Sequence, residues 1–285
     1  MNKLLTTWEE AVLWLRAQPE QQELVRACYY DDPLLEAAER FEASEEWQAV
    51  HKILPQQTSK ALDLGAGRGI SSYALAKAGW QVDALEPDAS AVVGRGAIEG
   101  LARESGLPIQ TLDGFAEKIP ARDEAYDLVY GRQVMHHAQN LQTMCREIHR
   151  VLKPGGTFVA TREHVISRKG DFPVFLANHP LHHLYGGENA FLLKEYLTAI
   201  EWAGLKVRRT YGQFDTPINY FPMSNVQWQE EIQHPLAKWL GRRTTRILLS
   251  DMFPWSGFIN GKLSSRASHR DQTPGRMYSF VAIKP

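Results

Sequence analysis

Apolar positions recur at helical spacing through the first part of the chain. Between Trp8 and Leu54, clusters of apolar residues are separated by three, four and six positions among acidic residues and glutamines. Such spacing is typical of helices that bury one face. Pro55 closes the stretch, because the residue before a proline avoids helical geometry. We therefore predict that residues 1–55 form an N-terminal helical segment lying over the rest of the protein.

From residue 56 onward, short apolar strands alternate with helical stretches. The pattern predicts strands over 60–64, 81–85, 109–112, 126–130 and 156–161, and helices over 71–78, 89–104 and 144–152. This β-α-β order indicates an α/β fold with a mostly parallel sheet and helices on both faces. Right-handed crossovers would bring the carboxyl ends of the strands to one edge, where open α/β sheets bind ligands.

The last third of the chain predicts a helix over 189–203 and two further strands, over 205–211 and 277–283, which bring the sheet to seven strands. About 60 residues separate the last two strands, far more than a hairpin needs. Residues 212–275 are therefore expected to be an insertion, helical over 225–252 and able to act as a lid. Residues 56–211 and 276–285 would form the main domain. Before the predicted helix, Tyr185 to Asn189 fits a substrate loop, or a simple turn with Asn189 as N-cap.

Composition narrows the possible partners and the compartment. The chain has 285 residues, 44% of them hydrophobic, with a formal net charge of −1. The chain has no excess of basic residues, which argues against a nucleic-acid partner. Two cysteines, Cys28 and Cys145, are too few for a disulfide framework and lack zinc-motif spacing. No signal peptide or membrane-spanning run is apparent, so we expect a cytoplasmic protein without a membrane partner.

A glycine-rich turn follows the first predicted strand. Gly65, Gly67 and Gly69 alternate with other residues after Asp63, and glycines let a backbone turn sharply against a ligand. Seventeen residues after Gly69, Glu86 ends the second strand, where a carboxylate can accept two ribose hydroxyls. The pattern indicates an adenosine-type cofactor. A dinucleotide fingerprint would have two residues between its second and third glycines, and this loop has one, so a nicotinamide cofactor is the second reading.

Five segments in order extend this pattern over residues 58 to 162. They are LDLGAGRG (62–69), VDALEPD (82–88), TLDGFAEKIP (111–120), YDLVYGRQVMHHA (126–138) and EIHRVLKPGG (147–156). Together they resemble the class I S-adenosylmethionine-dependent methyltransferase domain, particularly its small-molecule branch. The resemblance covers a little over a third of the chain, and it implies a Rossmann-like fold with S-adenosylmethionine as cofactor.

The resemblance also implies roles for individual residues. Around the methionine half of the cofactor it places Asp63, Gly65 and Gly67; at the ribose, Glu86; at the adenine, Asp113, Gly114 and Phe115; and between cofactor and methyl acceptor, Gly131 and Arg132. Structural roles remain open for three of them. Asp63 could brace the glycine loop, Asp113 could cap a helix, and Arg132 could form a buried ion pair.

Histidines are the candidate general bases. His136, His164 and His183 follow predicted strands or lie in the connection after them, near the ligand edge of the sheet. We expect no metal, because no cysteine accompanies the histidines and Glu188 and Asp171 lack a recognisable ligand spacing. The predicted function is methyl transfer to a polar or anionic small molecule, such as a sugar or a carboxylate-bearing metabolite. A nicotinamide-dependent oxidoreductase and a non-catalytic cofactor-binding module are the alternatives.

Overall fold

A single mixed sheet forms the centre of the computed structural model, which describes residues 7–179, 181–249 and 254–285. The strand order is β3-β2-β1-β4-β5-β8-β7, and a short β6 pairs with β5 off this path. β8 runs antiparallel to both of its neighbours, and the other pairs are parallel. The strands are β1 (Lys60–Leu64), β2 (Gln81–Leu85), β3 (Ile109–Leu112), β4 (Tyr126–Arg132), β5 (Leu152–Ile166), β6 (Phe191–Leu192), β7 (Lys206–Tyr211) and β8 (Arg276–Ile283).

The seven predicted strands and the mostly parallel sheet are thus confirmed, with β6 as a small addition. Central strands of this kind are apolar on both faces because helices cover both. In β1, Leu62 and Leu64 face one hydrophobic cluster and Ala61 faces the other. The alternation of side chains along a strand therefore feeds two cores, one on each side of the sheet.

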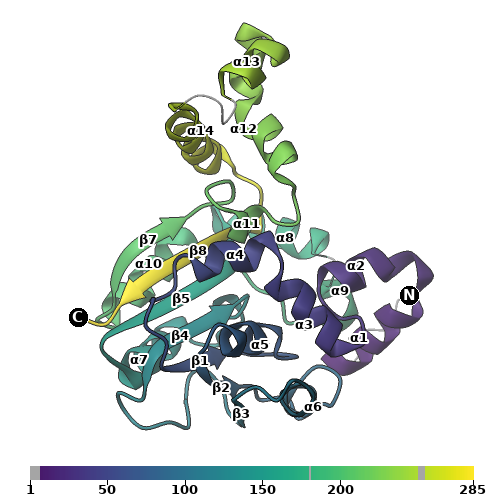
Figure 1. Cartoon of the computed structure of the whole chain (residues 1–285), viewed down its shortest axis with the longest axis vertical. Helices are drawn as coiled ribbons and strands as arrows, with labels where there is room; N and C mark the ends of the chain where they lie inside the picture. The colour runs from purple at the N-terminus through teal and green to yellow at the C-terminus, as the bar shows by residue number, and fades with distance from the viewer. Residues whose placement is uncertain (1–6, 180, 250–253) are drawn as a thin grey trace.

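Helices cover the two faces of the sheet (Figure 1). Those N-terminal to the sheet or within its first half are α1 (Trp8–Ala17), α2 (Gln22–Ala27), α3 (Leu34–Glu42), α4 (Glu45–His51), α5 (Ile70–Lys77) and α6 (Arg95–Ser105). One cluster joins α3, α4 and α5 to the sheet, and the other joins α7 (Leu141–Val151) and α10 (Leu193–Trp202) to its opposite face. The N-terminal helices therefore pack on the main domain, as expected for a segment that lies over it.

Most of the described residues between β7 and β8 are helical, and a helix was predicted over 225–252. They form α11 (Pro217–Tyr220), α12 (Asn225–Leu240), α13 (Arg242–Leu248) and α14 (Ser256–Arg270). Figure 1 shows α12, α13 and α14 projecting from one end of the sheet. The helix expected over 225–252 is two helices in the structure, because Gly241, at φ +81°, ends α12. Met252 lies outside the described residues.

Outside the insertion, three predicted elements begin or end four residues or more away from their place in the structure. α6 begins at Arg95 rather than at residue 89, because the Ser90 hydroxyl accepts the N–H groups of Val92 and Val93 in a turn. Asn189 is not a helix N-cap; β6 follows it, and α10 begins only at Leu193.

The third difference is β5, which extends to Ile166 and carries His164 within the strand instead of after it. Two short helices, α8 (Phe172–Asn178) and α9 (His182–Tyr185), then connect β5 to β6. Among the described residues, no helix is both long and apolar enough to cross a bilayer.

Candidate active site

A cavity of about 650 Å³ opens at the carboxyl ends of β1, β2, β4 and β5. Its size is that of a site for a cofactor or a small ligand. Of the residues predicted from the sequence, the wall includes Gly65, Gly67, Glu86, Gly114, Phe115, Arg132, His136 and His164. The predicted residues Asp63, Asp113, Gly131 and His183 lie outside this wall. The strand ends thus bring together eight of the twelve side chains and glycines that the sequence singled out.

Glu86 links the end of β2 to the glycine loop. Its Oε2 accepts a hydrogen bond from the backbone N–H of Gly67 at 2.8 Å, and its Oε1 accepts one from Asp88 at 3.0 Å. The residue is 5% exposed, and burial raises the pKa of its carboxyl group. Each oxygen keeps a further lone pair for a donor in the cavity. Two hydroxyls on adjacent carbons, as on a ribose, are such donors.

The backbone approaches its neighbours closely at two glycines. Gly65 has φ +64°, and a Cβ there would lie 2.4 Å from Val134 Cγ2. A Cβ on Gly131 would lie 2.5 Å from Val134 Cγ1. Both glycines therefore let the ends of β1 and β4 close around one side chain. Gly131 acts as a packing residue behind the cavity wall, and Gly65 also forms part of the wall.

Asp63 is buried beneath the glycine loop. The Ser72 hydroxyl, on α5, donates to Asp63 Oδ2 at 2.6 Å. Burial raises the pKa of Asp63 to about 7, against the hydrogen bond from Ser72. The contact joins β1 to the helix that follows the loop. This geometry matches the bracing alternative for Asp63.

Asp113 points away from the cavity. Its side chain is 71% exposed, and its Oδ1 pairs with Arg95 Nη1 at 2.8 Å. Gly114 and Phe115, beside it, do line the cavity, and Phe115 is 61% exposed. A role for the Asp113 carboxylate at an adenine ring stays a prediction.

Arg132 forms the buried ion pair that the sequence left open. Its Nε donates to Glu46 Oε1 at 2.6 Å, and the Glu46 side chain is fully buried. Arg162 also approaches the same carboxylate, at 3.7 Å. Although burial opposes ionisation, the two guanidinium groups hold the pKa of Glu46 below its usual value. Arg132 therefore lines the cavity with its charge already partnered.

The N-terminal segment supplies wall residues that the sequence did not single out for the site. Trp8, Cys28, Tyr29 and Tyr30 line the cavity. The indole Nε1 of Trp8 is buried and has no hydrogen-bond partner in the part of the chain that the structure describes. An unpaired donor in the wall fits an acceptor atom on a ligand. The helical pattern of this segment predicted packing, and only its three-dimensional course reveals the contact.

The histidines divide into a buried cluster and an exposed residue. The rings of His136 and His164 lie 4.7 Å apart, and those of His164 and His179 lie 5.2 Å apart. Glu188 is also buried there, with Oε2 3.8 Å from His136 Nε2. His183 is exposed and bonds to the carbonyl of Ala177, away from the cavity wall. His179 and Glu188 are brought to the cluster by the β5–β6 connection, which sequence spacing did not reveal.

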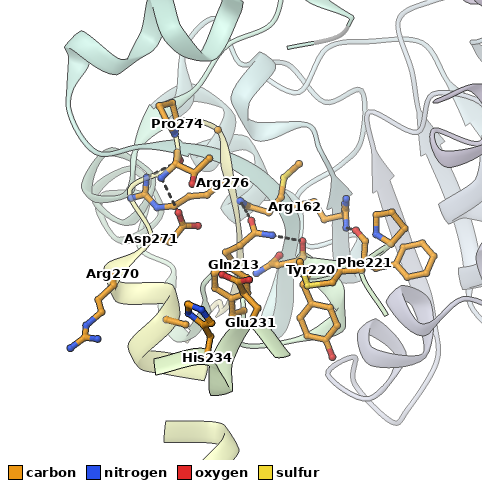
Figure 2. A pocket seen from close by; sticks show the side chains of 18 of the residues that line it. Arg162, Gln213, Tyr220, Phe221, Glu231, His234, Arg270, Asp271, Pro274 and Arg276 are labelled. Atoms are coloured by element: carbon orange, nitrogen blue, oxygen red, sulfur yellow. Dashed lines mark hydrogen bonds between the residues drawn. The ribbon is translucent and has the colours of Figure 1, made fainter. Parts of the chain in front are cut away.

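A second cavity, of about 670 Å³, adjoins the first and is shown in Figure 2. Arg162, Pro222 and Met277 line both cavities. The insertion supplies much of the second wall, through α11, α12 and α14. Arg276 stands in this wall with 9% exposure, while Arg270 points outward in Figure 2. The insertion thus borders a space that shares three wall residues with the predicted cofactor cavity.

Comparison with known proteins agrees with the site geometry. Residues 62–160 match the family described as "Methyltransferase domain". A ubiquinone biosynthesis O-methyltransferase from Methylobacterium nodulans is 28% identical over 169 residues, which cover 58% of this chain and 67% of the relative. A sarcosine/dimethylglycine N-methyltransferase from Aphanothece halophytica is 36% identical over 106 residues, covering 36% of this chain and 37% of the relative. The alignments thus span about two thirds and just over a third of these relatives.

The fold is also that of a known methyltransferase. Geranyl diphosphate C-methyltransferase from Streptomyces coelicolor A3(2), solved with S-adenosyl-L-homocysteine, has a TM-score of 0.58 to this chain. The match covers 99% of this chain and 86% of that one at 15% identity.

The matches favour S-adenosylmethionine over a nicotinamide cofactor and an enzyme over a non-catalytic module. The close-packed glycine loop, Glu86 and the unpaired Trp8 indole fit this cofactor. Residues 62–160 thus form a methyltransferase domain with S-adenosylmethionine as its cofactor, and the chain resembles the class I S-adenosylmethionine-dependent methyltransferases.

Proposed function

We propose that this enzyme methylates a small molecule that carries an anionic group, such as a carboxylate-bearing metabolite. The observation that carries the proposal is the state of Arg276. This guanidinium is buried in the wall of the second cavity, and it forms no ion pair with any residue that the structure describes. Burying a charge without an ionic partner costs several kcal/mol, on the order of the penalty for breaking a buried pair, and the Tyr278 ring, whose centroid is 5.7 Å from Arg276 Cζ, offsets part of this cost.

Neighbouring residues satisfy the hydrogen-bonding groups of the Arg276 guanidinium only in part. Its Nη1 lies 3.4 Å from the carbonyl oxygens of Val165 and Thr273, at the outer limit of a hydrogen bond. Its Nε is buried without a partner among the described residues. A carboxylate or phosphate of the acceptor would pair with this guanidinium in a fork-like geometry.

Positive charge where the two cavities adjoin also supports an anionic acceptor. Arg132 and Arg162 share the single carboxylate of Glu46, so this group of three side chains carries one positive charge in excess. Arg162 lines both cavities and lies on the route between them. An anionic acceptor held at Arg276 could therefore extend its reacting atom toward the first cavity, past a second favourable charge.

Methyl transfer makes modest chemical demands on the protein. S-adenosylmethionine, when bound, supplies an electrophilic methyl group on a sulfonium. The protein's own residues must hold the acceptor's lone pair in line with that group and exclude water. The walls from the N-terminal segment and from the insertion serve the second task. For a hydroxyl or ammonium acceptor, His136 and His164 stay the predicted bases. Each histidine can fill this role only while the nitrogen that accepts the proton binds no metal ion.

The names of the relatives leave the acceptor atom open. One relative is named as an O-methyltransferase and another as an N-methyltransferase. Sarcosine and dimethylglycine, in the second name, both carry a carboxylate, which supports an anionic acceptor without identifying it.

The test is a panel of acceptors matched in size and differing in charge, with formation of S-adenosylhomocysteine as the readout. We expect turnover with carboxylates or phosphates, and a KM for the best acceptor raised at least tenfold by Arg276→Met with an unchanged Kd for S-adenosylmethionine. Arg270→Met is the matched control, because that exposed arginine borders the same cavity. Turnover of neutral acceptors only, or an Arg276→Met enzyme with the wild-type KM, would refute the anionic acceptor.

A further inference from the structure

Three buried side chains at the first cavity converge, and a fourth adjoins them. His136, His164 and Glu188 each place a ligand-type atom within 4.8 Å of the others, and all three are buried. His179 Nε2 lies 3.7 Å from Glu188 Oε2. The four residues come from the end of β4, from β5 and from the β5–β6 connection, so the fold rather than the sequence assembles them. We propose that His136, His164, His179 and Glu188 bind a divalent first-row transition-metal ion.

The orientation of His136 is set by Glu163. The Glu163 carboxylate accepts the backbone N–H groups of Val134, Met135 and His136 at 3.1 Å, and His136 Nδ1 lies 2.7 Å from its Oε2. Four contacts occupy all four lone-pair positions of an ionised carboxylate. Nδ1 must then be the donor, which leaves the Nε2 lone pair of a neutral His136 facing the cluster. A carboxylate that orients the far nitrogen of a histidine is typical of metal-binding histidines.

His164 and Glu188 are oriented in a similar way. His164 Nδ1 lies 3.0 Å from the carbonyl oxygen of Gly275, which can only accept, so Nδ1 carries the hydrogen and Nε2 is free. The Tyr185 hydroxyl donates to Glu188 Oε1 at 2.9 Å and leaves Oε2 toward the histidines. Burial also lowers the pKa of His136, His164 and His179, which favours the neutral imidazoles that metal ions require.

The spacing of these atoms leaves room for an ion between them. Glu188 Oε2 is 3.8 Å from His136 Nε2 and 3.7 Å from His179 Nε2, beyond hydrogen-bond distance. Oε2 and the His136 Nε2 are both acceptors, so their mutual approach in a buried site is favourable only with a cation or a hydrogen-bond donor between them. Ligand atoms around a tetrahedral ion with bonds of about 2.1 Å lie roughly 3.4 Å apart. The ligand atoms of His136, His164 and Glu188 lie within 4.8 Å of one another, so a bound ion would draw them together to complete such a shell.

The donor set selects the class of metal. Three imidazoles and one carboxylate favour zinc, manganese, iron, cobalt or nickel over calcium or magnesium, which prefer oxygen ligands. All four residues also line the cavity that contains the glycine loop and Glu86. An ion held here would be in contact with the contents of that cavity. The sequence analysis expected no metal, because the ligand spacing in the chain matches no known motif.

The test uses the full chain, free of any affinity tag, after chelation and dialysis. We expect one equivalent of Co²⁺ to bind with a visible d–d absorption band, and Zn²⁺ to displace it. His164→Ala and Glu188→Gln should each weaken Co²⁺ binding by about 100-fold, more than the 10-fold minimum typical of an orienting partner. Glu163→Gln, which disturbs the orientation of His136, should weaken it by about 10-fold. His183→Ala is the control, because that exposed histidine lies four residues after His179 but outside the cluster.

Two results would overturn the site. One is the absence of stoichiometric Co²⁺ or Zn²⁺ binding by the folded protein. The other is binding that His164→Ala and Glu188→Gln leave unchanged while His183→Ala abolishes it. Circular dichroism of each variant separates loss of the site from loss of the fold, and Glu188→Gln, which preserves shape, keeps the test valid if His164→Ala does not fold. None of these readouts requires a known methyl acceptor.

Discussion

Oε1 of Glu46 accepts a hydrogen bond from Nε of Arg132 at 2.6 Å, and this contact ties α4 of the N-terminal segment to the end of β4. The two residues are 86 positions apart in the chain. Their pairing anchors the segment that supplies Trp8 and Tyr30 to the wall of the cofactor cavity. The arginine placed near the cofactor by the sequence therefore also has a structural role.

Loss of the Glu46 carboxylate should destabilise the protein strongly. Glu46→Gln leaves Arg132 and Arg162 buried without their counter-charge, and breaking a buried pair costs about 3–5 kcal/mol. Urea unfolding measures the change. Glu45→Gln is the matched control, because this neighbouring glutamate is exposed. A difference between the two variants below about 1 kcal/mol would show that the ion pair does not hold the segment in place.

Close packing at the ends of β1 and β4 gives a second prediction. Gly131→Ala would place a Cβ 2.5 Å from Val134 Cγ1, so we expect a loss of about 1–3 kcal/mol in the free energy of unfolding. The double variant Gly131→Ala/Val134→Ala removes the clashing methyl groups and should recover part of that loss. Gly100→Ala, on the open face of α6, should leave stability unchanged or raise it by up to about 1 kcal/mol. Additive effects of the two substitutions at 131 and 134 would argue against the contact.

The raised pKa of Asp63 predicts that the stability of the protein depends on pH. Its pKa is about 7 in the folded protein, raised by burial, and near the ordinary value of 3.8 when unfolded. At a pH between these two pKa values, the Asp63 carboxyl group is protonated in the folded state and ionised in the unfolded state. The free energy of unfolding therefore falls as the pH rises from about 4 to about 7. Asp63→Asn removes this titration. Relative to that variant, wild type should lose about 2.5 kcal/mol between pH 5 and pH 7.5 in urea unfolding experiments. Parallel curves for the two proteins would contradict the raised pKa.

The sheet and the cofactor loop were predictable because they depend on local patterns. β1, β2 and β3 have the predicted bounds, since each is a short apolar run between turn residues. The glycine loop and Glu86 sit at strand ends, and parallel strands bring those ends to one edge. Asp63 and Asp113 were placed in the right region, but their side chains point to Ser72 and Arg95, which only the packing of α5 and α6 decides.

The histidine cluster shows the limit of sequence spacing. His136 and His164 were chosen because each lies near a strand end, and they do meet. Glu188 joins them from a connection whose path no periodicity describes, and His183, a few residues before it, turns outward. Glu163 was not singled out because a charged residue within an apolar strand gives no sign of its partners. Its four contacts are visible only in three dimensions.

Isothermal titration calorimetry with S-adenosylmethionine and S-adenosylhomocysteine tests the cofactor site most directly. The site predicts one equivalent of each ligand bound per chain, with affinity reduced at least tenfold by Glu86→Ala, since a carboxylate accepting two hydroxyls contributes about 1.5–3 kcal/mol per hydrogen bond. Glu104→Ala, at an exposed position on α6, should bind as wild type does. Failure of the folded protein to bind either ligand, or a Glu86→Ala variant with unchanged affinity, would contradict the assignment of this cavity to the cofactor.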